Sequence, residues 1–215
     1  MKYIIMCGGT YIRWSAPRQL TKIHGECLVA RTIRLLRENG VEDIAISAQD
    51  NRFEKFGVPV LYHKNYFEVS GHEDVKGAWY NCFYPTDEST CYLFGDVVYS
   101  PKAIKTIIEY KTDKIMFFAS APPFAKEYPK PWVEPFAFKV TDTEYFKWVL
   151  KNVREYDEKK LFQRPPIAWE VWQCCLGKSL DYRDVDYSTY VHINDYTCDI
   201  DQPEDIVYFE GVVDG

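Results

Sequence analysis

The chain has 215 residues, of which 47% are hydrophobic and 27% are charged, and its formal net charge is −6. This composition is typical of one globular domain, and the acidic balance argues against a general nucleic-acid binder, which needs a broad basic surface. No apolar run approaches the roughly 20 residues that span a bilayer, so we expect no membrane partner. The seven cysteines form no CxxC pair. We therefore expect reduced thiols and a cytoplasmic protein, not a disulfide framework or a zinc site.

The first half of the chain alternates between short apolar runs and amphipathic segments. The apolar runs predict strands and the amphipathic segments predict helices. We expect strands at 3–7, 43–47, 59–62, 91–94 and 115–119, and helices at 26–39, 74–83 and from 101 onward. This alternation predicts an α/β fold of three layers, Rossmann-like, with helices on both faces of a mixed, mostly parallel sheet.

The pattern changes after residue 121, where prolines interrupt an aromatic stretch. Beyond this stretch we expect strands near 136–140 and 190–193, and helices near 143–153, near 167–176 and from 203 onward. The segment at about 122–180 is typical of an insertion that covers the sheet. We therefore predict one domain over residues 1–215 that carries this inserted segment.

Charge is unevenly distributed along the chain. The first 25 residues contain no acidic side chain and four basic ones, whereas the last 35 contain ten acidic side chains and one basic one. The acidic segment is interleaved with tyrosine, valine and isoleucine, which favours a folded segment over a solvated tail. A basic first loop and an acidic last segment could serve one site that binds both phosphate and a cation.

The first predicted strand ends at Gly8-Gly9-Thr10 and a basic loop comes directly after it. Glycines let backbone N–H groups approach anionic oxygens, and arginines neutralise them, so this loop is a candidate phosphate site. Neither GxxxxGK[ST] nor GxGxxG is present, which excludes a P-loop and the dinucleotide-binding fingerprint.

Three groups of motifs, taken in order, resemble the sugar-phosphate nucleotidyltransferase superfamily over about the full length of the chain. The first group is Cys7 to Arg13, Pro17 to Leu20 and Ile23 to Leu28, followed by the amphipathic helix; the second is Leu93-Phe94-Gly95-Asp96; the third is Asp199 to Ile206. The sequence departs from the family at Tyr11, where the family has a loop glycine, and at Arg18, where it has a catalytic lysine. Arginine at this position keeps the positive charge and can grip phosphate bidentately.

The resemblance implies a metal-dependent enzyme that transfers a nucleotidyl group from an NTP to a small phosphorylated acceptor and releases pyrophosphate. CTP or UTP is favoured, and the acceptor is a sugar phosphate, a polyol phosphate or phosphocholine, bound beside the 122–180 segment. The implied cofactor is Mg²⁺, which prefers one or two carboxylates together with phosphates and waters. The expected metal ligands are Asp96, Asp201 and Asp199, and the expected catalytic residues are Arg13, Arg18, Asp96 and Asp201. The expected nucleotide-binding residues are Gly8, Gly9, Thr10, Arg13, Arg18 and Gly77.

Other interpretations stay open at this point. The acceptor pocket could be an aromatic cage that draws on Trp132, Glu134 and Phe136 or on Trp169, Glu170 and Trp172, although core packing explains these residues equally well. The chain could also bind a nucleotide or nucleotide sugar without transfer. A glycosyltransferase of similar topology is disfavoured because Asp96 is not part of an Asp-x-Asp motif. A non-catalytic interaction protein and a homodimer also stay open.

Overall fold

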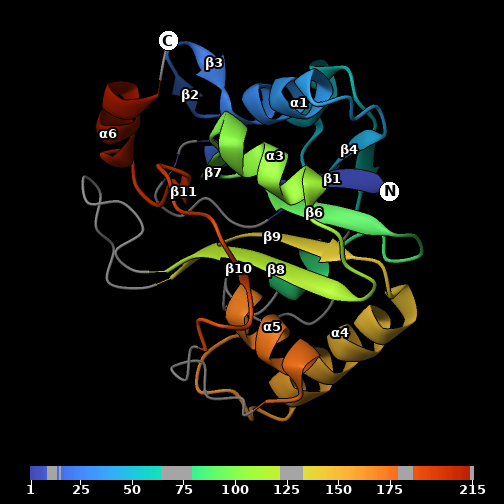
Figure 1. The fold of residues 1–215 in the computed structure, drawn as a ribbon. Coiled ribbons are helices and arrows are strands. Elements are labelled where there is room, and N and C mark those ends of the chain that lie inside the picture. The colour runs from blue at the N-terminus through green and yellow to red at the C-terminus, as the bar shows by residue number, and fades with distance from the viewer. Residues whose placement is uncertain (9–13, 15, 64–78, 122–132, 179–185, 214–215) are drawn as a thin grey trace.

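The computed structural model describes residues 1–8, 14, 16–63, 79–121, 133–178 and 186–213. Its centre is a seven-stranded sheet in the order β10-β8-β9-β6-β1-β4-β5 (Figure 1). The strands are β1 (Lys2–Met6), β4 (Ile44–Ala48), β5 (Val60–Tyr62), β6 (Thr90–Phe94), β8 (Ile115–Ser120), β9 (Glu134–Val140) and β10 (Val191–His192). All neighbouring strands run parallel except β9, which is antiparallel to both β6 and β8. The predicted mixed, mostly parallel sheet is confirmed.

Helices cover both faces of this sheet. Figure 1 shows α1 and α3 on one side of the strands and α4 and α5 on the other. The helices are α1 (Leu28–Glu38), α3 (Pro101–Glu109), α4 (Thr143–Glu158), α5 (Ala168–Leu176) and α6 (Asp205–Val212). The expected three-layer, Rossmann-like α/β fold is therefore confirmed. Within the described ranges, no helix is both long and apolar enough to cross a membrane.

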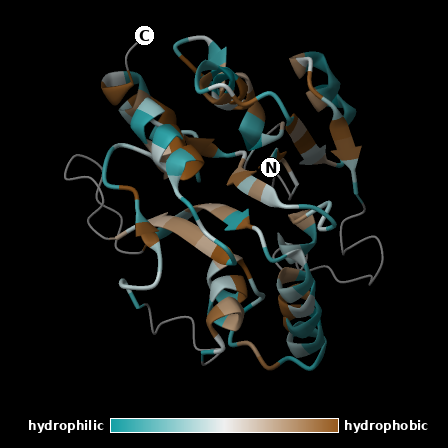
Figure 2. Cartoon of the chain, turned by 45° about the vertical axis from the view of Figure 1, so that its right-hand side comes forward, coloured by the Kyte–Doolittle hydropathy of each residue, from teal (hydrophilic) through white to brown (hydrophobic). Residues whose placement is uncertain are grey.

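Local chemistry explains where these elements begin and which side they bury. Helix α3 starts at Ser100, whose hydroxyl accepts a hydrogen bond from the N–H of Ala103, and Pro101 occupies the first helical turn, where a missing N–H costs nothing. Strand β1 is buried along almost its whole length, as expected for a strand covered on both faces. Figure 2 shows hydrophobic colour concentrated in the sheet, while the helices alternate between hydrophobic and hydrophilic residues.

The layer between the sheet and helices α4 and α5 is an aromatic core. Phe83 makes edge-to-face contacts with Phe138 and Phe146 at 5.1 Å between ring centroids, and Phe138 lies 4.6 Å from Phe117. Edge-to-face pairs add to the free energy gained from burial alone. Much of the aromatic content of the chain is therefore used for packing.

The other face of β9 stabilises α3. Lys139 is 5% exposed, and its ammonium donates hydrogen bonds of 2.8–2.9 Å to the carbonyls of Ile107, Ile108 and Tyr110 at the end of that helix. A cation at a helix C-terminus satisfies carbonyls that lack intrahelical partners and complements the helix dipole.

Two helices predicted in the first half of the chain differ in the structure. The helix expected at 26–39 begins two residues later, because His24 and Gly25 take positive φ angles of 48° and 81° and turn the chain into a short hairpin of β2 (Lys22–Ile23) and β3 (Glu26–Cys27). Of the helix expected at 74–83, the structure describes only a 3₁₀ turn at Trp79–Cys82. The segment predicted as an insertion at 122–180 contributes β9 to the middle of the sheet. Its role beside the acceptor stays a prediction.

Candidate active site

The strand order of the sheet reverses between β1 and β6, which pair with each other. The chain runs from β1 outward to β4 and β5, then returns to β6 on the other side of β1. In open α/β sheets, ligands bind at the carboxyl ends of the strands where this reversal occurs. Gly8 lies just beyond the end of β1, and Gly95 and Asp96 come directly after β6. The topology alone therefore makes this edge the first candidate for a ligand site.

At both strand ends a glycine lies where any side chain would collide with a neighbour, a backbone oxygen at Gly95 and a side-chain sulfur at Gly8. A Cβ on Gly95 would lie 2.6 Å from the carbonyl oxygen of Met6 and 2.8 Å from Sγ of Cys7. A Cβ on Gly8 would lie 2.3 Å from Sγ of Cys82. Burial raises the pKa of Cys82 to about 12, so this thiol is neutral and acts as a packing group. The close approach at Gly95 places Asp96 directly beside the end of β1.

The acidic C-terminal segment is fastened beside Asp96 by backbone pairing. Strand β11 (Cys198–Asp199) pairs antiparallel with β7 (Val97–Val98), and the N–H of Ile200 donates to the carbonyl of Asp96 at 2.9 Å. Asp199 and Asp201 are two residues apart, so their side chains lie on the same side of this extended segment. The predicted meeting of opposite halves of the chain is therefore present.

Arg18 connects the first loop to these carboxylates. It begins the 3₁₀ turn Arg18–Leu20, and its guanidinium contacts Asp96 at 2.5 Å and Asp201 at 3.3 Å. It also donates to the carbonyl of Ile200 at 3.3 Å. Attraction to Asp96 is the largest cause that raises the pKa of Arg18; burial opposes it, and Asp199 and Asp201 add to it. Arg18 therefore carries a permanent positive charge beside Asp96 and Asp201.

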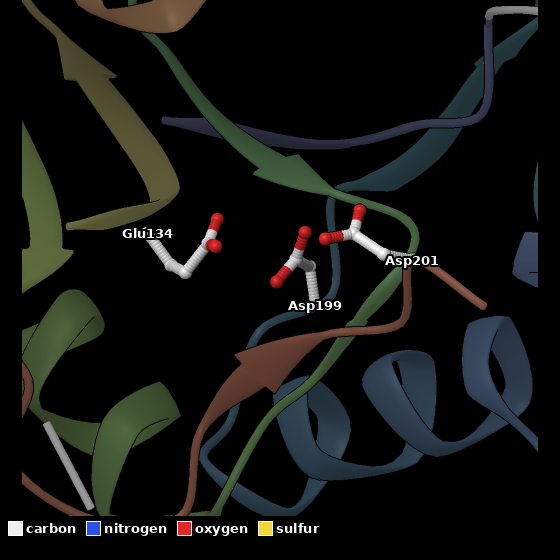
Figure 3. A group of neighbouring side chains, drawn as sticks. All are labelled: Glu134, Asp199 and Asp201. Atoms are coloured by element: carbon white, nitrogen blue, oxygen red, sulfur yellow. The ribbon is translucent and has the colours of Figure 1, made fainter. Parts of the chain in front are cut away.

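Three carboxylates, one of them Asp201, lie together next to the contact between Arg18 and Asp96. Glu134, Asp199 and Asp201 each offer an oxygen within 4.8 Å of the others, and Figure 3 shows their carboxylates pointing toward one another. Glu134 begins β9 and is 5% exposed, whereas the Asp201 side chain is 46% exposed. Hard divalent cations such as Mg²⁺ and Mn²⁺ prefer oxygen donors of this kind, so the donor set fits the metal that the sequence resemblance implied.

The structure brings some of the predicted residues together and leaves others outside its description. Arg18, Asp96, Asp199 and Asp201 meet at the ends of β1 and β6, and Gly8 follows the end of β1. The predicted residues Gly9, Thr10, Arg13 and Gly77, and the substituted Tyr11, lie outside the described residues. The roles assigned to all of these residues stay predictions.

Sequence reasoning placed Glu134 with the acceptor aromatics and missed its position beside Asp199 and Asp201. The available signal was its place two residues before the strand predicted near 136–140, which in the structure begins at Glu134. Gln19 was also missed. It is 3% exposed, its amide lies 3.5 Å from the carbonyl of Gly8, and its side-chain oxygen has no hydrogen-bond partner among the described residues.

The aromatic cage considered for the acceptor is not formed by α5. The indole N–H groups of Trp169 and Trp172 donate to the carbonyl of Val133 and the hydroxyl of Thr189, and both rings pack in the core. Glu170 is 1% exposed and is paired with Arg164 at 2.8 Å. For these residues the structure favours core packing over a cage.

Three solved structures share this fold along nearly the whole chain. An inositol-1-phosphate CTP transferase from T. maritima is 17% identical, with a TM-score of 0.59 over 100% of this chain and 98% of that one. A glucose-1-phosphate thymidylyltransferase from Bacillus anthracis, in complex with a sucrose, is 15% identical, with a TM-score of 0.56 over 99% of this chain and 94% of that one. A 4-diphosphocytidyl-2C-methyl-D-erythritol synthase from Anaerococcus prevotii is 16% identical, with a TM-score of 0.50 over 98% of this chain and 96% of that one. No family model and no curated protein matches the sequence. At these identities the likeness establishes the fold, and it agrees with the resemblance found in the motifs.

Proposed function

We propose that this protein is a metal-dependent nucleotidyltransferase. It transfers a nucleoside monophosphate from an NTP, with CTP or UTP favoured, to a small phosphorylated acceptor and releases pyrophosphate. The single observation that carries the proposal is the meeting of Arg18 with Asp96 and with the Asp199–Asp201 segment at the strand-order reversal. Three neighbours in fold that are named as transferases or synthases of this chemistry support it.

The reaction brings two anions together, and the charges of the site suit this task. A phosphate oxygen of the acceptor attacks the α-phosphorus, a new P–O bond forms, and the bond to the β-phosphate oxygen breaks as pyrophosphate leaves. Arg18 supplies positive charge at the ends of β1 and β6 without needing to titrate, because its guanidinium stays protonated. A preorganised cation of this kind stabilises charge that develops during transfer.

The divalent cation belongs to the same proposal. Asp199 and Asp201, together with Glu134, are the carboxylates that would hold it, and when bound it supplies charge neutralisation to the phosphates. Asp96 was also predicted as a ligand, and in the structure it pairs with Arg18. A cytoplasmic location and phosphorylated sugars, polyols or phosphocholine as acceptors complete the proposal. The sugar and polyol acceptors agree with the glucose-1-phosphate and inositol-1-phosphate in the neighbours' names.

Pyrophosphate release tests the proposal directly. The purified protein is supplied with each NTP, Mg²⁺ and a panel of sugar phosphates, polyol phosphates and phosphocholine. We expect at least one pairing to release pyrophosphate, and Asp199→Asn to abolish most of that release. Lys105→Ala is a matched control, because Lys105 is exposed on α3 and pairs only with Glu109 among the described residues. No release with any pairing, despite tight nucleotide binding, would exclude the transferase.

A second function is favoured by the same arginine. Arg18 contacts two carboxylates, which leaves less of its charge for a triphosphate than an unpaired lysine would offer. A protein that binds nucleotide without transfer fits this arrangement. The two functions separate in one experiment, since a binder shifts its melting temperature with NTP and Mg²⁺ but releases no pyrophosphate.

A further inference from the structure

The backbone that carries Asp201 is held by hydrogen bonds at successive peptide groups. The N–H of Ile200 donates to the carbonyl of Asp96 at 2.9 Å, and the carbonyl of Ile200 accepts from Arg18 at 3.3 Å. The carbonyl of Asp201 accepts from the indole N–H of Trp14 at 3.4 Å. The side chain of Asp201 leaves from this backbone, so its direction depends on how firmly the backbone is held.

Asp205 holds the peptide groups on the other side of this carboxylate. Its Oδ2 accepts hydrogen bonds from the N–H of Asp201 at 2.8 Å and from the N–H of Gln202 at 3.1 Å. The N–H of Asp205 donates to the carbonyl of Gln202 at 3.1 Å. Asp205 is 3% exposed, so water cannot replace its carboxylate unless the segment opens. These bonds close the turn that carries Asp201.

Helix α6 gives Asp205 a firm base. Asp205 is the first residue of the helix, and α6 packs against β2 (Figure 1). Phe209 of the helix is fully buried in a second hydrophobic cluster that includes Ile23. Beyond the helix, Nε2 of His24 lies 3.0 Å from the carbonyl oxygen of Val213. The Asp205 carboxylate therefore reaches the turn from an element that is fastened to the β2–β3 hairpin.

The ion pair with Arg18 is too weak to fix Asp201 by itself. The contact is 3.3 Å long, and the Asp201 side chain is 46% exposed. Ion pairs of this kind contribute little, because water screens them and both side chains lose freedom. Loss of a buried acceptor, by contrast, leaves backbone N–H groups without a partner, which costs more. The direction of the Asp201 side chain therefore depends more on Asp205 than on Arg18.

We propose that Asp205 is a positioning residue, whose buried carboxylate fixes the backbone of Asp201 and so holds the Asp201 side chain opposite Arg18. The inference rests on the proposed function, since it bears on catalysis only if Asp201 and Arg18 serve the transfer. Asp205 acts through two peptide groups and not through contact with the substrate. What it must supply is one oxygen that accepts two hydrogen bonds.

This requirement defines a conservative variant and a control. Both N–H groups donate to the same oxygen, so Asp205→Asn keeps an acceptor for both, whereas Asp205→Ala removes it. Asp195→Ala is the matched control. Asp195 accepts from the N–H of Thr197 at 2.8 Å and from the hydroxyl of Ser100 at 2.6 Å, so it closes a turn that is tied to the start of α3.

Amide hydrogen exchange tests the hydrogen bonds without any substrate. Exchange of the Asp201 and Gln202 amides is followed by NMR on the isotope-labelled full chain. We expect Asp205→Ala to accelerate both by about tenfold or more, and Asp205→Asn and Asp195→Ala to change them by no more than about threefold. The indole N–H signal of Trp14, assigned with Trp14→Phe, should shift in Asp205→Ala and stay in place in Asp195→Ala. Unchanged exchange in Asp205→Ala would overturn the proposal.

Turnover then separates positioning from general stability. Per folded molecule, Asp205→Ala should lower kcat by about tenfold or more, and Asp205→Asn should recover most of it. Once Asp201 is already Asn, Asp205→Ala should add little, because its effect passes through Asp201. Asp195→Ala should lower the melting temperature and leave kcat unchanged. Equal losses of kcat in Asp195→Ala and Asp205→Ala, or additive losses with Asp201→Asn, would show a merely structural role.

The conservative variant keeps the proposal testable if Asp205→Ala does not fold. A folded Asp205→Asn that loses as much kcat as Asp201→Asn would show that the charge of Asp205 acts, and would contradict positioning through hydrogen bonds. A protein that never releases pyrophosphate contradicts the proposed function. The exchange rates of the Asp201 and Gln202 amides still decide in that case whether Asp205 fixes the turn.

Discussion

Replacing Gly8 with alanine separates packing from phosphate binding at the end of β1. The new Cβ would lie 2.3 Å from Sγ of Cys82 and 3.3 Å from Cε1 of His63, so the thiol must move. Cys82 is 3% exposed, which leaves it little room. Overpacking of this kind costs about 1–3 kcal/mol. For a chain of this size each kcal/mol lowers the melting temperature by about 2–4 °C, so Gly8→Ala should melt about 2–12 °C below wild type.

Truncating the thiol should reverse this loss. In Gly8→Ala/Cys82→Ala the alanine methyl occupies space that Sγ leaves, so the double variant should be more stable than the sum of the single changes by about 1–3 kcal/mol. Gly95→Ala is the matched control, because its Cβ would meet the backbone oxygen of Met6 at 2.6 Å, and Cys82→Ala cannot relieve that contact. The measurement is urea unfolding of all the variants. Additive single effects would refute the packing argument. A rescued double variant that no longer binds NTP would show that Gly8 also serves the phosphate site.

The site and the buried thiols allow three more tests. Arg18→Ala should lower the rate of pyrophosphate release by a factor of about 10²–10³, by analogy with the loss of one oxyanion donor. Arg18→Lys should recover activity. Equal rates in wild type and Arg18→Ala would show that Arg18 takes no part in the mechanism. Nucleotide binding measured by calorimetry should be tighter with Mg²⁺ than with chelator, and Asp201→Asn should remove most of that gain; equal affinities under both conditions would contradict the metal site. Burial raises the pKa of Cys82, Cys91 and Cys174 to about 12 from an ordinary value of 9.0. The folded state therefore keeps protons that the unfolded chain loses, so stability should fall between about pH 9 and 12, by up to about 1.4 kcal/mol per pH unit for each thiol. Urea midpoints that stay constant across this range would contradict the burial of these thiols.

Local patterns in the sequence were enough to predict most of the strands and helices and to single out several candidate residues that the structure brings together. Runs such as 3–7 and 91–94 carry continuous apolar side chains, and the strand that results depends mainly on this local pattern. The position of Gly95 and Asp96 at the end of the run 91–94 could also be predicted locally, because a buried apolar strand ends before a charged side chain. The spacing of Asp199 and Asp201 placed both carboxylates on one side before any fold was known.

Which of these groups meet depends on the arrangement of the elements in space. Arg18 and Asp201 are 183 positions apart, and no spacing rule relates two segments that only the strand order brings together. Glu134 joins Asp199 and Asp201 because β9 runs antiparallel between β6 and β8, which local periodicity cannot show. The sequence around Trp172 is compatible both with a ligand-binding cage and with packing in the core. Only the placement of α5 against the sheet, which brings Trp172 into contact with Phe117, makes it a core residue. Contacts within an element depend on a few neighbouring residues, whereas contacts between elements depend on the path of the whole chain.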